Sequence, residues 1–166
     1  MIFELATFDF KNALQANITN VDRIELCHDY SSGGITPDIK LIESVLKFVT
    51  VDVFIMIRCR SGNFVYNENE STKMINDIDI FKRLNVNGFV FGALNSNNQV
   101  DESVCKKIID KAHPLPVTFH RAFDSCTDLY QSSETIIKCG FKRILTSGGN
   151  RTAYEGRFRL KKLIEK

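Results

Sequence analysis

Short runs of strand-forming residues alternate with helical patterns along the whole chain, and this alternation limits the possible folds more than any other feature. The predicted strands begin near residues 2, 23, 52, 88, 117 and 143, so each strand–helix unit spans about 20–35 residues. Units of this length are typical of parallel sheets, because a parallel connection has to cross the sheet, usually as a helix. We therefore predict an α/β protein built on a parallel sheet.

The predicted elements leave no room for a linker, so we expect residues 1–166 to form a single domain. Thr36 is the predicted N-cap of the second helix, with Pro37 in its first turn, and Asp101 is the predicted N-cap of the fourth. The last helix is predicted to end at Lys166. The predicted strands are Ile2–Ala6, Arg23–Cys27, Val51–Arg58, Gly88–Gly92, Val117–His120 and Arg143–Thr146.

The side chains of the second strand favour a barrel over an open sheet. Ile24 and Leu26 lie on one face, whereas Arg23, Glu25 and Cys27 lie on the other. An apolar outer face against helices and a partly polar inner face suit a TIM (β/α) barrel, while an open doubly wound sheet is usually apolar on both faces. Six strand–helix units are present where such a barrel has eight. We therefore expect a barrel that is truncated at its C-terminus.

Composition and charge exclude several classes of protein. The 22 basic and 20 acidic residues nearly balance and form no basic cluster, so we expect no nucleic-acid binding. No stretch approaches the ~20 apolar residues of a membrane-spanning helix. The N-terminus lacks the pattern of a signal peptide, and the five cysteines form no CxxC pair, which indicates free thiols. These features predict a cytoplasmic protein.

Residues able to do chemistry gather where the predicted strands end. In barrels and open α/β sheets alike, ligands bind at the C-terminal ends of the strands. Glu4 and Glu25 lie slightly deeper and are expected to face the same cavity. The residues at the strand ends are Cys27, Arg58, Cys59, Arg60, His120, Arg121, Asp124, Thr146 and Ser147.

Two of these groups suit acid–base chemistry. Glu25 or Glu4 is a candidate base, and His120 is a candidate acid or electrophile. Structural alternatives remain open for both. Glu25 can instead form a buried ion pair with Arg23 or Arg58, because a buried charge has to be paired. His120 can be a core histidine whose hydrogen bonds are satisfied.

The arginines and a glycine pair suggest an anion site. Arg58 and Arg60 are spaced so that both guanidinium groups can reach one phosphate or carboxylate. Arg23, Arg121 and Asp124 complete the predicted ligand-binding set with Thr146 and Ser147. The Ser147-Gly148-Gly149 turn offers backbone N–H groups of the kind that bind phosphate. A solvated loop rim and a plain turn are the structural alternatives.

Two thiols suggest a metal site. Cys27 and Cys59 end neighbouring predicted strands, and thiolates select Cu(I). The alternative is that each is a small buried apolar residue. Cys105 and Cys139 fall in predicted helices, where we expect them to pack in the core.

Six segments of the chain, in order and covering nearly its whole length, resemble the signature blocks of the CutC copper-homeostasis family. Together they are far more specific than any one of them. The segments are DRIELC (22–27), GGITP (33–37), MIRCRSGNF (56–64), GFVFG (88–92), PVTFHRAFD (116–124) and RILTSGG (143–149).

The resemblance implies a TIM barrel, a cytoplasmic location, self-association and a role in copper binding and tolerance. Family members often carry a cysteine at the end of the first strand, which with the position of Cys27 forms a proposed Cu(I) pair; this chain has Ala6 there. Cys59 stands where the family usually has proline. The family's seventh and eighth strands have no counterpart in this sequence.

Three hypotheses about function follow. The first is a copper-homeostasis protein that binds Cu(I) through Cys27, with Cys59 as a second ligand. The second is a barrel enzyme that acts on a small anionic metabolite by acid–base chemistry. Schiff-base chemistry is not expected, because no lysine ends a predicted strand. The third is a truncated copy without function.

Overall fold

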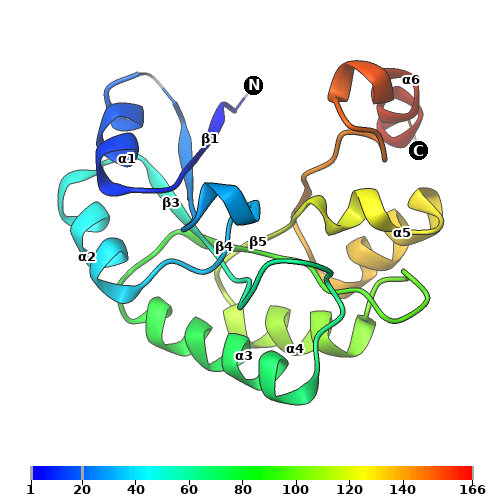
Figure 1. The fold of residues 1–166 in the computed structure, drawn as a ribbon, viewed down its shortest axis with the longest axis horizontal. Helices are drawn as coiled ribbons and strands as arrows, with labels where there is room; N and C mark the ends of the chain where they lie inside the picture. Colours follow the sequence, from blue (N-terminus) through cyan, green and yellow to red (C-terminus); the bar gives the residue numbers. More distant parts are fainter. Residues whose placement is uncertain (1, 20, 166) are drawn as a thin grey trace.

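The computed structural model describes residues 2–19 and 21–165, whose strands form one parallel sheet. The sheet keeps chain order from β1 to β6 (Figure 1), as the alternating pattern predicts. The strands are β1 (Glu4–Thr7), β2 (Arg23–Leu26), β3 (Asp52–Met56), β4 (Gly88–Phe91), β5 (Val117–Phe119) and β6 (Arg143–Ile144). The helices are α1 (Phe10–Asn17), α2 (Ile39–Phe48), α3 (Glu68–Lys82), α4 (Glu102–Ala112), α5 (Leu129–Cys139) and α6 (Ala153–Ile164), with short 3-10 helices η1 (Tyr30–Ser32) and η2 (Arg121–Ser125).

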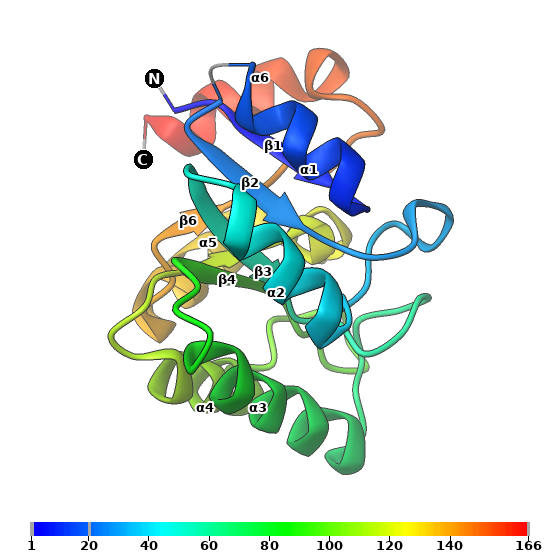
Figure 2. The same cartoon turned by 90° about the vertical axis from the view of Figure 1, so that its left-hand side faces the viewer.

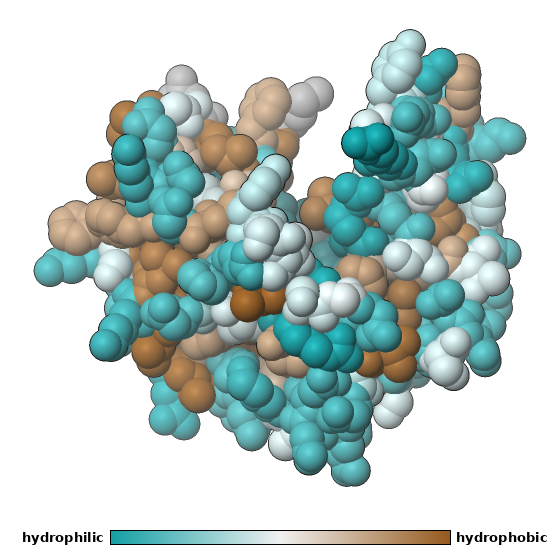
Figure 3. All heavy atoms as spheres, viewed as in Figure 1, coloured by the Kyte–Doolittle hydropathy of each residue, from teal (hydrophilic) through white to brown (hydrophobic). Residues whose placement is uncertain are grey.

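The sheet curls into an open half-barrel with helices on its outer side (Figures 1 and 2). Within the described residues, β1 and β6 are the two edges of the sheet, and no strand joins them. The space-filling view shows the opening as a notch between the N-terminal side of the molecule and α6 (Figure 3). The predicted α/β class is therefore confirmed, whereas a closed barrel is not part of this structure.

The two faces of the sheet carry different cores. Ile24 and Leu26 are fully buried in the large apolar layer between sheet and helices. A smaller cluster contains Cys27, with the buried side chains of Phe54 and Met56. Burying one such large apolar side chain stabilises the fold by about 1.5–3 kcal/mol. The predicted alternation along β2, with a partly polar inner face, is thus confirmed.

The start of α2 differs from the prediction. Asp38 is the N-cap, since its side chain accepts a hydrogen bond from the Leu41 N–H at 2.9 Å. Thr36 is held elsewhere: its hydroxyl accepts from the Arg58 N–H at 2.8 Å, and its own N–H donates to the Arg58 carbonyl at 2.9 Å. The tertiary contact with the end of β3 therefore overrides the local capping signal of Thr36.

Two further predictions concern the N-cap of α4 and the end of the last helix. Asp101 caps α4 as predicted, accepting from the Val104 N–H at 3.1 Å. Lys166, the predicted end of the last helix, lies outside the described residues. In the part of the chain that the structure describes, no helix is both long enough and apolar enough to cross a membrane.

Candidate functional site

A cavity of about 180 Å³ lies at the C-terminal ends of the strands, where the sequence predicts a ligand site. Its volume is well below the ~300–1,000 Å³ of sites for drug-sized ligands, so it suits a small molecule. Its walls are mostly apolar, with a few polar groups among them. The lining residues are Ala6, Phe8, Glu25, Cys27, Gly33, Met56, Arg58, Phe64, His120, Arg121 and Leu145.

Glu25 is the carboxyl group of the cavity. Strand β2 places it on the inner face, where it is 5% exposed. Oε1 accepts a hydrogen bond from the Cys27 thiol at 3.5 Å, and among the described residues no cation forms an ion pair with Glu25. Burial, with a smaller effect of the nearby Glu4 charge, raises the pKa of Glu25 to about 7. Glu25 can therefore exchange a proton near neutral pH.

His120 is the buried imidazole of the cavity, 3% exposed. Its Nδ1 accepts a hydrogen bond from the Ala122 N–H at 3.2 Å. Burial, helped by the positive charge of Arg58, lowers the pKa of His120 to about 3, so the ring is neutral. Since Nδ1 is an acceptor, the proton of the neutral ring is on Nε2. Within the described chain Nε2 has no hydrogen-bond partner.

The position of the imidazole depends on two neighbours. The Phe64 ring lies 5.0 Å from it, centroid to centroid. On the other side Gly92 approaches so closely that an added Cβ would lie 2.5 Å from Nδ1 of His120. Glycine at position 92 is therefore needed for His120 to occupy this place.

Arg58 is a buried cation beside the cavity, 6% exposed. Nη1 donates to the carbonyl oxygens of Ser32 and Gly34, both at 3.0 Å, and Nη2 donates to that of Gly62 at 2.9 Å. The guanidinium group also lies over the Phe64 ring, 4.9 Å from its centroid. The structure thus uses Arg58 to join the loop after β2 to the loop after β3.

Arg60 does not lie with Arg58 at the cavity, contrary to the prediction that both guanidinium groups face one site. Its guanidinium group pairs with Glu70 of α3, with Nε 2.5 Å from the carboxylate, and it lies over the Tyr66 ring. Arg60 is absent from the lining of the cavity. The prediction fails because β3 ends at Met56, so the alternation of a strand no longer applies four residues later.

The two predicted copper ligands also lie apart. Cys27 lines the cavity, whereas Cys59 packs against the core between sheet and helices. Burial and the Glu70 carboxylate raise the pKa of the Cys59 thiol; burial and the Glu25 carboxylate raise that of Cys27. In the described residues no three His, Cys, Asp or Glu side chains form a metal-binding group. Cys59 is thus absent from the lining of the cavity that Cys27 borders.

Glu4 and Arg23 form an ion pair below the cavity. Arg23 Nη1 lies 3.0 Å from the Glu4 carboxylate, and Nη2 lies 3.9 Å from that of Asp52. These three residues face one another at the start of neighbouring strands, and neither Glu4 nor Arg23 lines the cavity. The alternative in which Glu25 pairs with Arg23 or Arg58 is wrong, since Arg23 pairs with Glu4 and Asp52.

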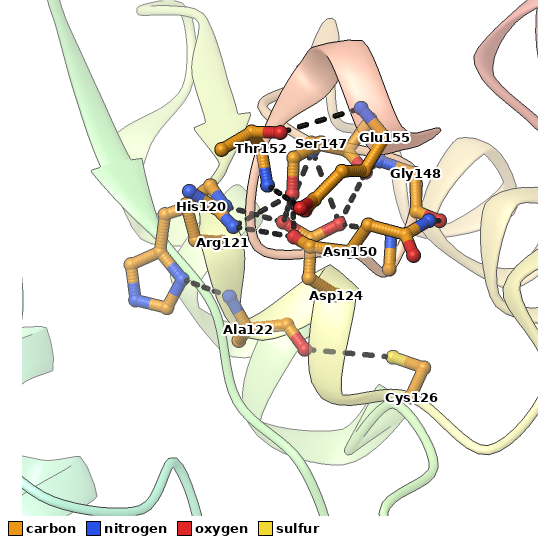
Figure 4. A network of polar contacts seen from close by, with 12 residues as sticks. His120, Arg121, Ala122, Asp124, Cys126, Ser147, Gly148, Asn150, Thr152 and Glu155 are labelled. Atoms are coloured by element: carbon orange, nitrogen blue, oxygen red, sulfur yellow. Dashed lines mark hydrogen bonds and ion pairs between the residues drawn. The ribbon is translucent and has the colours of Figure 1, made fainter. Parts of the chain in front are cut away.

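Asp124 is the centre of a second polar group, next to the cavity (Figure 4). It accepts hydrogen bonds from the Thr146 hydroxyl at 2.5 Å, from the Gly149 N–H at 2.7 Å and from the Ser147 N–H at 3.1 Å. Arg121 pairs with Asp124 and donates to the Ser147 hydroxyl at 2.7 Å. Burial opposes ionisation of Asp124, but these hydrogen bonds outweigh it and lower its pKa.

The N–H groups of the predicted phosphate-binding turn therefore already donate to side chains of the protein itself. The backbone N–H groups of Ser147 and Gly149 donate to Asp124, and that of Gly148 donates to the Thr146 hydroxyl at 2.8 Å. No donor of this turn is left for an external phosphate. Figure 4 shows the His120 ring apart from this network, with its drawn hydrogen bond going to the Ala122 N–H.

The sequence did not predict the apolar walls of the cavity. Phe8, Met56, Phe64 and Leu145 line it, and none of them carries a charge. Met56 was predictable in principle, since it follows Phe54 by two residues on the inner face of β3. Phe64 was not, because its place depends on the path of the loop that Arg58 holds.

Comparison with known proteins identifies the family. The CutC family model matches residues 1–166. A CutC family protein from Histophilus somni is 44% identical over 165 residues, which cover 99% of this chain and 68% of that relative. The human copper homeostasis protein cutC homolog is 40% identical over 164 residues, 99% of this chain and 60% of the relative.

A solved structure supports the same relationship. The CutC protein from Streptococcus agalactiae superposes with a TM-score of 0.92 at 31% identity, covering 99% of this chain and 82% of that one. The chain therefore spans about 60–68% of the length of the two curated relatives. With this coverage and this fold, the chain belongs to the CutC family.

Proposed function

We propose that the cavity binds a small molecule with a carbonyl oxygen and that Glu25 exchanges a proton with it. The observation that carries the proposal is that two buried polar groups line one cavity, and that among the described residues Glu25 has no ion-pair partner and His120 Nε2 has no hydrogen-bond partner. Buried polar groups in folded proteins are nearly always satisfied, so exceptions indicate a missing partner.

The two groups suit complementary roles in one reaction. The Glu25 carboxylate would take a proton from the carbon next to the carbonyl group; the electron pair of that C–H bond would form a C=C bond, and the π pair of the C=O bond would move onto the oxygen. The neutral Nε2–H of His120 would donate a hydrogen bond to the resulting oxyanion. Return of a solvent proton from Glu25 to the carbon completes the exchange. A base whose pKa is near 7 is well suited to this task.

Hydrogen–deuterium exchange of small carbonyl compounds tests this proposal. Hydroxyacetone and pyruvate would be incubated with the protein in D₂O, and loss of their C–H signals followed by proton NMR. We expect the wild type to accelerate exchange and Glu25→Gln to reduce the acceleration by about 100-fold or more. Glu4→Gln is the matched control, because Glu4 is the neighbouring carboxylate and does not line the cavity.

Two outcomes would contradict the proposal. One is equal exchange by wild type and Glu25→Gln. The other is no exchange of either compound together with no change, on their addition, in the NMR signal of the His120 ring.

The names of the relatives support a second proposal, a role in copper homeostasis. The specific observation is that two sulfur-containing residues, Cys27 and Met56, belong to one small inner cluster and line the same cavity. Thiolate and thioether sulfur are ligands that Cu(I) prefers. We propose Met56, in place of Cys59, as the second ligand beside Cys27.

Anaerobic titration with Cu(I) against a competing chelator tests the copper proposal. We expect Cys27→Ser and Met56→Leu each to weaken binding by tenfold or more, with Cys59→Ser unchanged as the control. Equal affinity in wild type and Cys27→Ser would exclude the cavity as the copper site. The five free cysteines of the chain also support our proposal of a reducing, cytoplasmic location.

A further inference from the structure

Arg58 is a cation without a counter-charge. No carboxylate forms an ion pair with it in the described part of the chain, although it is 6% exposed. Its three hydrogen bonds are to backbone carbonyl oxygens, which solvate the charge but do not cancel it. The contact with the Phe64 ring acts in the same way.

The guanidinium group also has unused donors. Arginine carries five N–H bonds, and three of those of Arg58 are engaged. Nε has no partner within the described residues, and Nη2 donates to the Gly62 carbonyl, with the Tyr66 side chain as a further polar neighbour of the guanidinium group. A buried charge in this state is costly unless another group pairs with it.

The other charges near the cavity do not supply that group. Arg121 lines the cavity but already pairs with Asp124. Glu25 is the carboxyl group of the lining, and its raised pKa leaves it partly protonated near pH 7. Arg58 is therefore the cation of the cavity lining that no ion pair among the described residues neutralises.

We propose that the ligand of this cavity is a small monoanion whose negative charge is paired with Arg58. The inference rests on the proposed function, which places a ligand between Glu25 and His120. The same molecule would then bring a carbonyl oxygen to His120 and a carboxylate to Arg58. A short 2-oxo acid is the chemical class that combines the two groups within about 180 Å³.

The hydrogen bonds of Arg58 also fix where the negative charge of the ligand would bind. Its guanidinium group joins the carbonyl oxygens of Ser32 and Gly34 to that of Gly62, so the anion would bind where two loops meet. Arg60, two residues later, provides a natural contrast. Its charge is paired with Glu70 away from the cavity, so it has no part in anion binding.

Pyruvate and pyruvamide are suitable probes, because they share a shape and differ in charge. Binding would be measured on the full chain by NMR titration, with the His120 ring signal and the Nε–H signals of Arg58 and Arg60 as readouts. We expect pyruvate to bind wild type at least about tenfold more tightly than pyruvamide and to shift Arg58 Nε–H but not Arg60 Nε–H. Arg58→Gln should abolish the preference, and the matched control Arg60→Gln should retain it.

If Arg58→Gln fails to fold, the wild-type measurement still tests the inference, because the Arg58 Nε–H signal reports anion binding without any substitution. Equal affinity for the two probes, with the His120 signal shifted by both, would overturn the inference and leave the proposed cavity site standing. A shift of neither His120 nor Arg58 by pyruvate, acetate or formate at 100 mM would overturn both.

Discussion

Two polar groups lie side by side at the C-terminal ends of the strands, and they differ in how far the protein satisfies them. Around Asp124, hydroxyl groups, backbone N–H groups and Arg121 all converge on one carboxylate. Around the cavity, Glu25 has no cation and His120 Nε2 has no hydrogen-bond partner among the described residues. Both groups contain a carboxylate that is largely shielded from solvent, so residue type does not separate a structural site from a candidate functional one. The unused hydrogen-bonding capacity does.

Replacing each carboxylate by its amide should therefore have opposite effects on stability. Asp124→Asn removes the charge that Arg121 and the turn at residues 147–149 bind, and leaves their donors poorly paired. We expect the free energy of unfolding at pH 7 to fall by about 2–4 kcal/mol, because hydrogen bonds to a charged group are lost while the half-exposed Arg121 is resolvated by water. Urea denaturation followed by circular dichroism measures it. A loss below about 1 kcal/mol would mean that the network contributes little.

Glu25→Gln should stabilise the protein at high pH. The pKa of Glu25 is about 7 in the fold and 4.5 ordinarily, so the folded chain holds the proton more tightly than the unfolded chain. Its contribution to stability is thus complete below about pH 4.5 and is lost as the pH rises through about 7. Above pH 8, the free energy of unfolding of Glu25→Gln should therefore exceed that of the wild type by up to about 3 kcal/mol.

The same variant should show little change at pH 4, where Glu25 is protonated in both states. Urea denaturation of both proteins at pH 4, 6 and 8 gives the comparison. A gain that does not grow with pH would show that Glu25 is not held protonated by burial.

Gly92→Ala tests whether the cavity depends on the place of His120. The added methyl group would lie 2.5 Å from Nδ1 and 2.6 Å from Cε1 of the imidazole, so the ring has to move. We expect a loss of about 1–3 kcal/mol, typical of overpacking, and a changed NMR signal of the His120 ring. An unchanged ring signal would mean that the backbone moves instead and that Gly92 does not position the imidazole.

The sequence predicts the parts of this structure that follow from periodicity. The order of strands, their inner and outer faces and the cap at Asp101 depend on local pattern, and the structure confirms them. The polar strand ends were also predictable as a set. The alternation along β2 placed Glu25 and Cys27 on the face that lines the cavity.

The errors lie where the chain leaves regular structure. Cys59 and Arg60 follow the end of β3, so their directions depend on the loop and on contacts with α3. Thr36 fits an N-cap by sequence, but it bonds to the backbone of Arg58 instead. The pairing of Glu4 with Arg23 is equally non-local, because it joins two neighbouring strands, and the pattern within one strand cannot predict it.

The smallest effect on stability should come from removing one hydrogen bond of the group around Asp124. Thr146→Val keeps the shape of the side chain but removes the hydroxyl that donates to Asp124 at 2.5 Å and accepts from the Gly148 N–H at 2.8 Å. Because Asp124 keeps its other donors, we expect a loss of only about 1–2 kcal/mol by urea denaturation. Thr146→Ser is the control and should stay close to wild type. Thr146 does not line the cavity, so the His120 ring signal and probe binding should not change in either variant. If Thr146→Val weakened pyruvate binding as much as it weakened stability, the two polar groups would form one cooperative unit, and unused hydrogen-bonding capacity would no longer distinguish them.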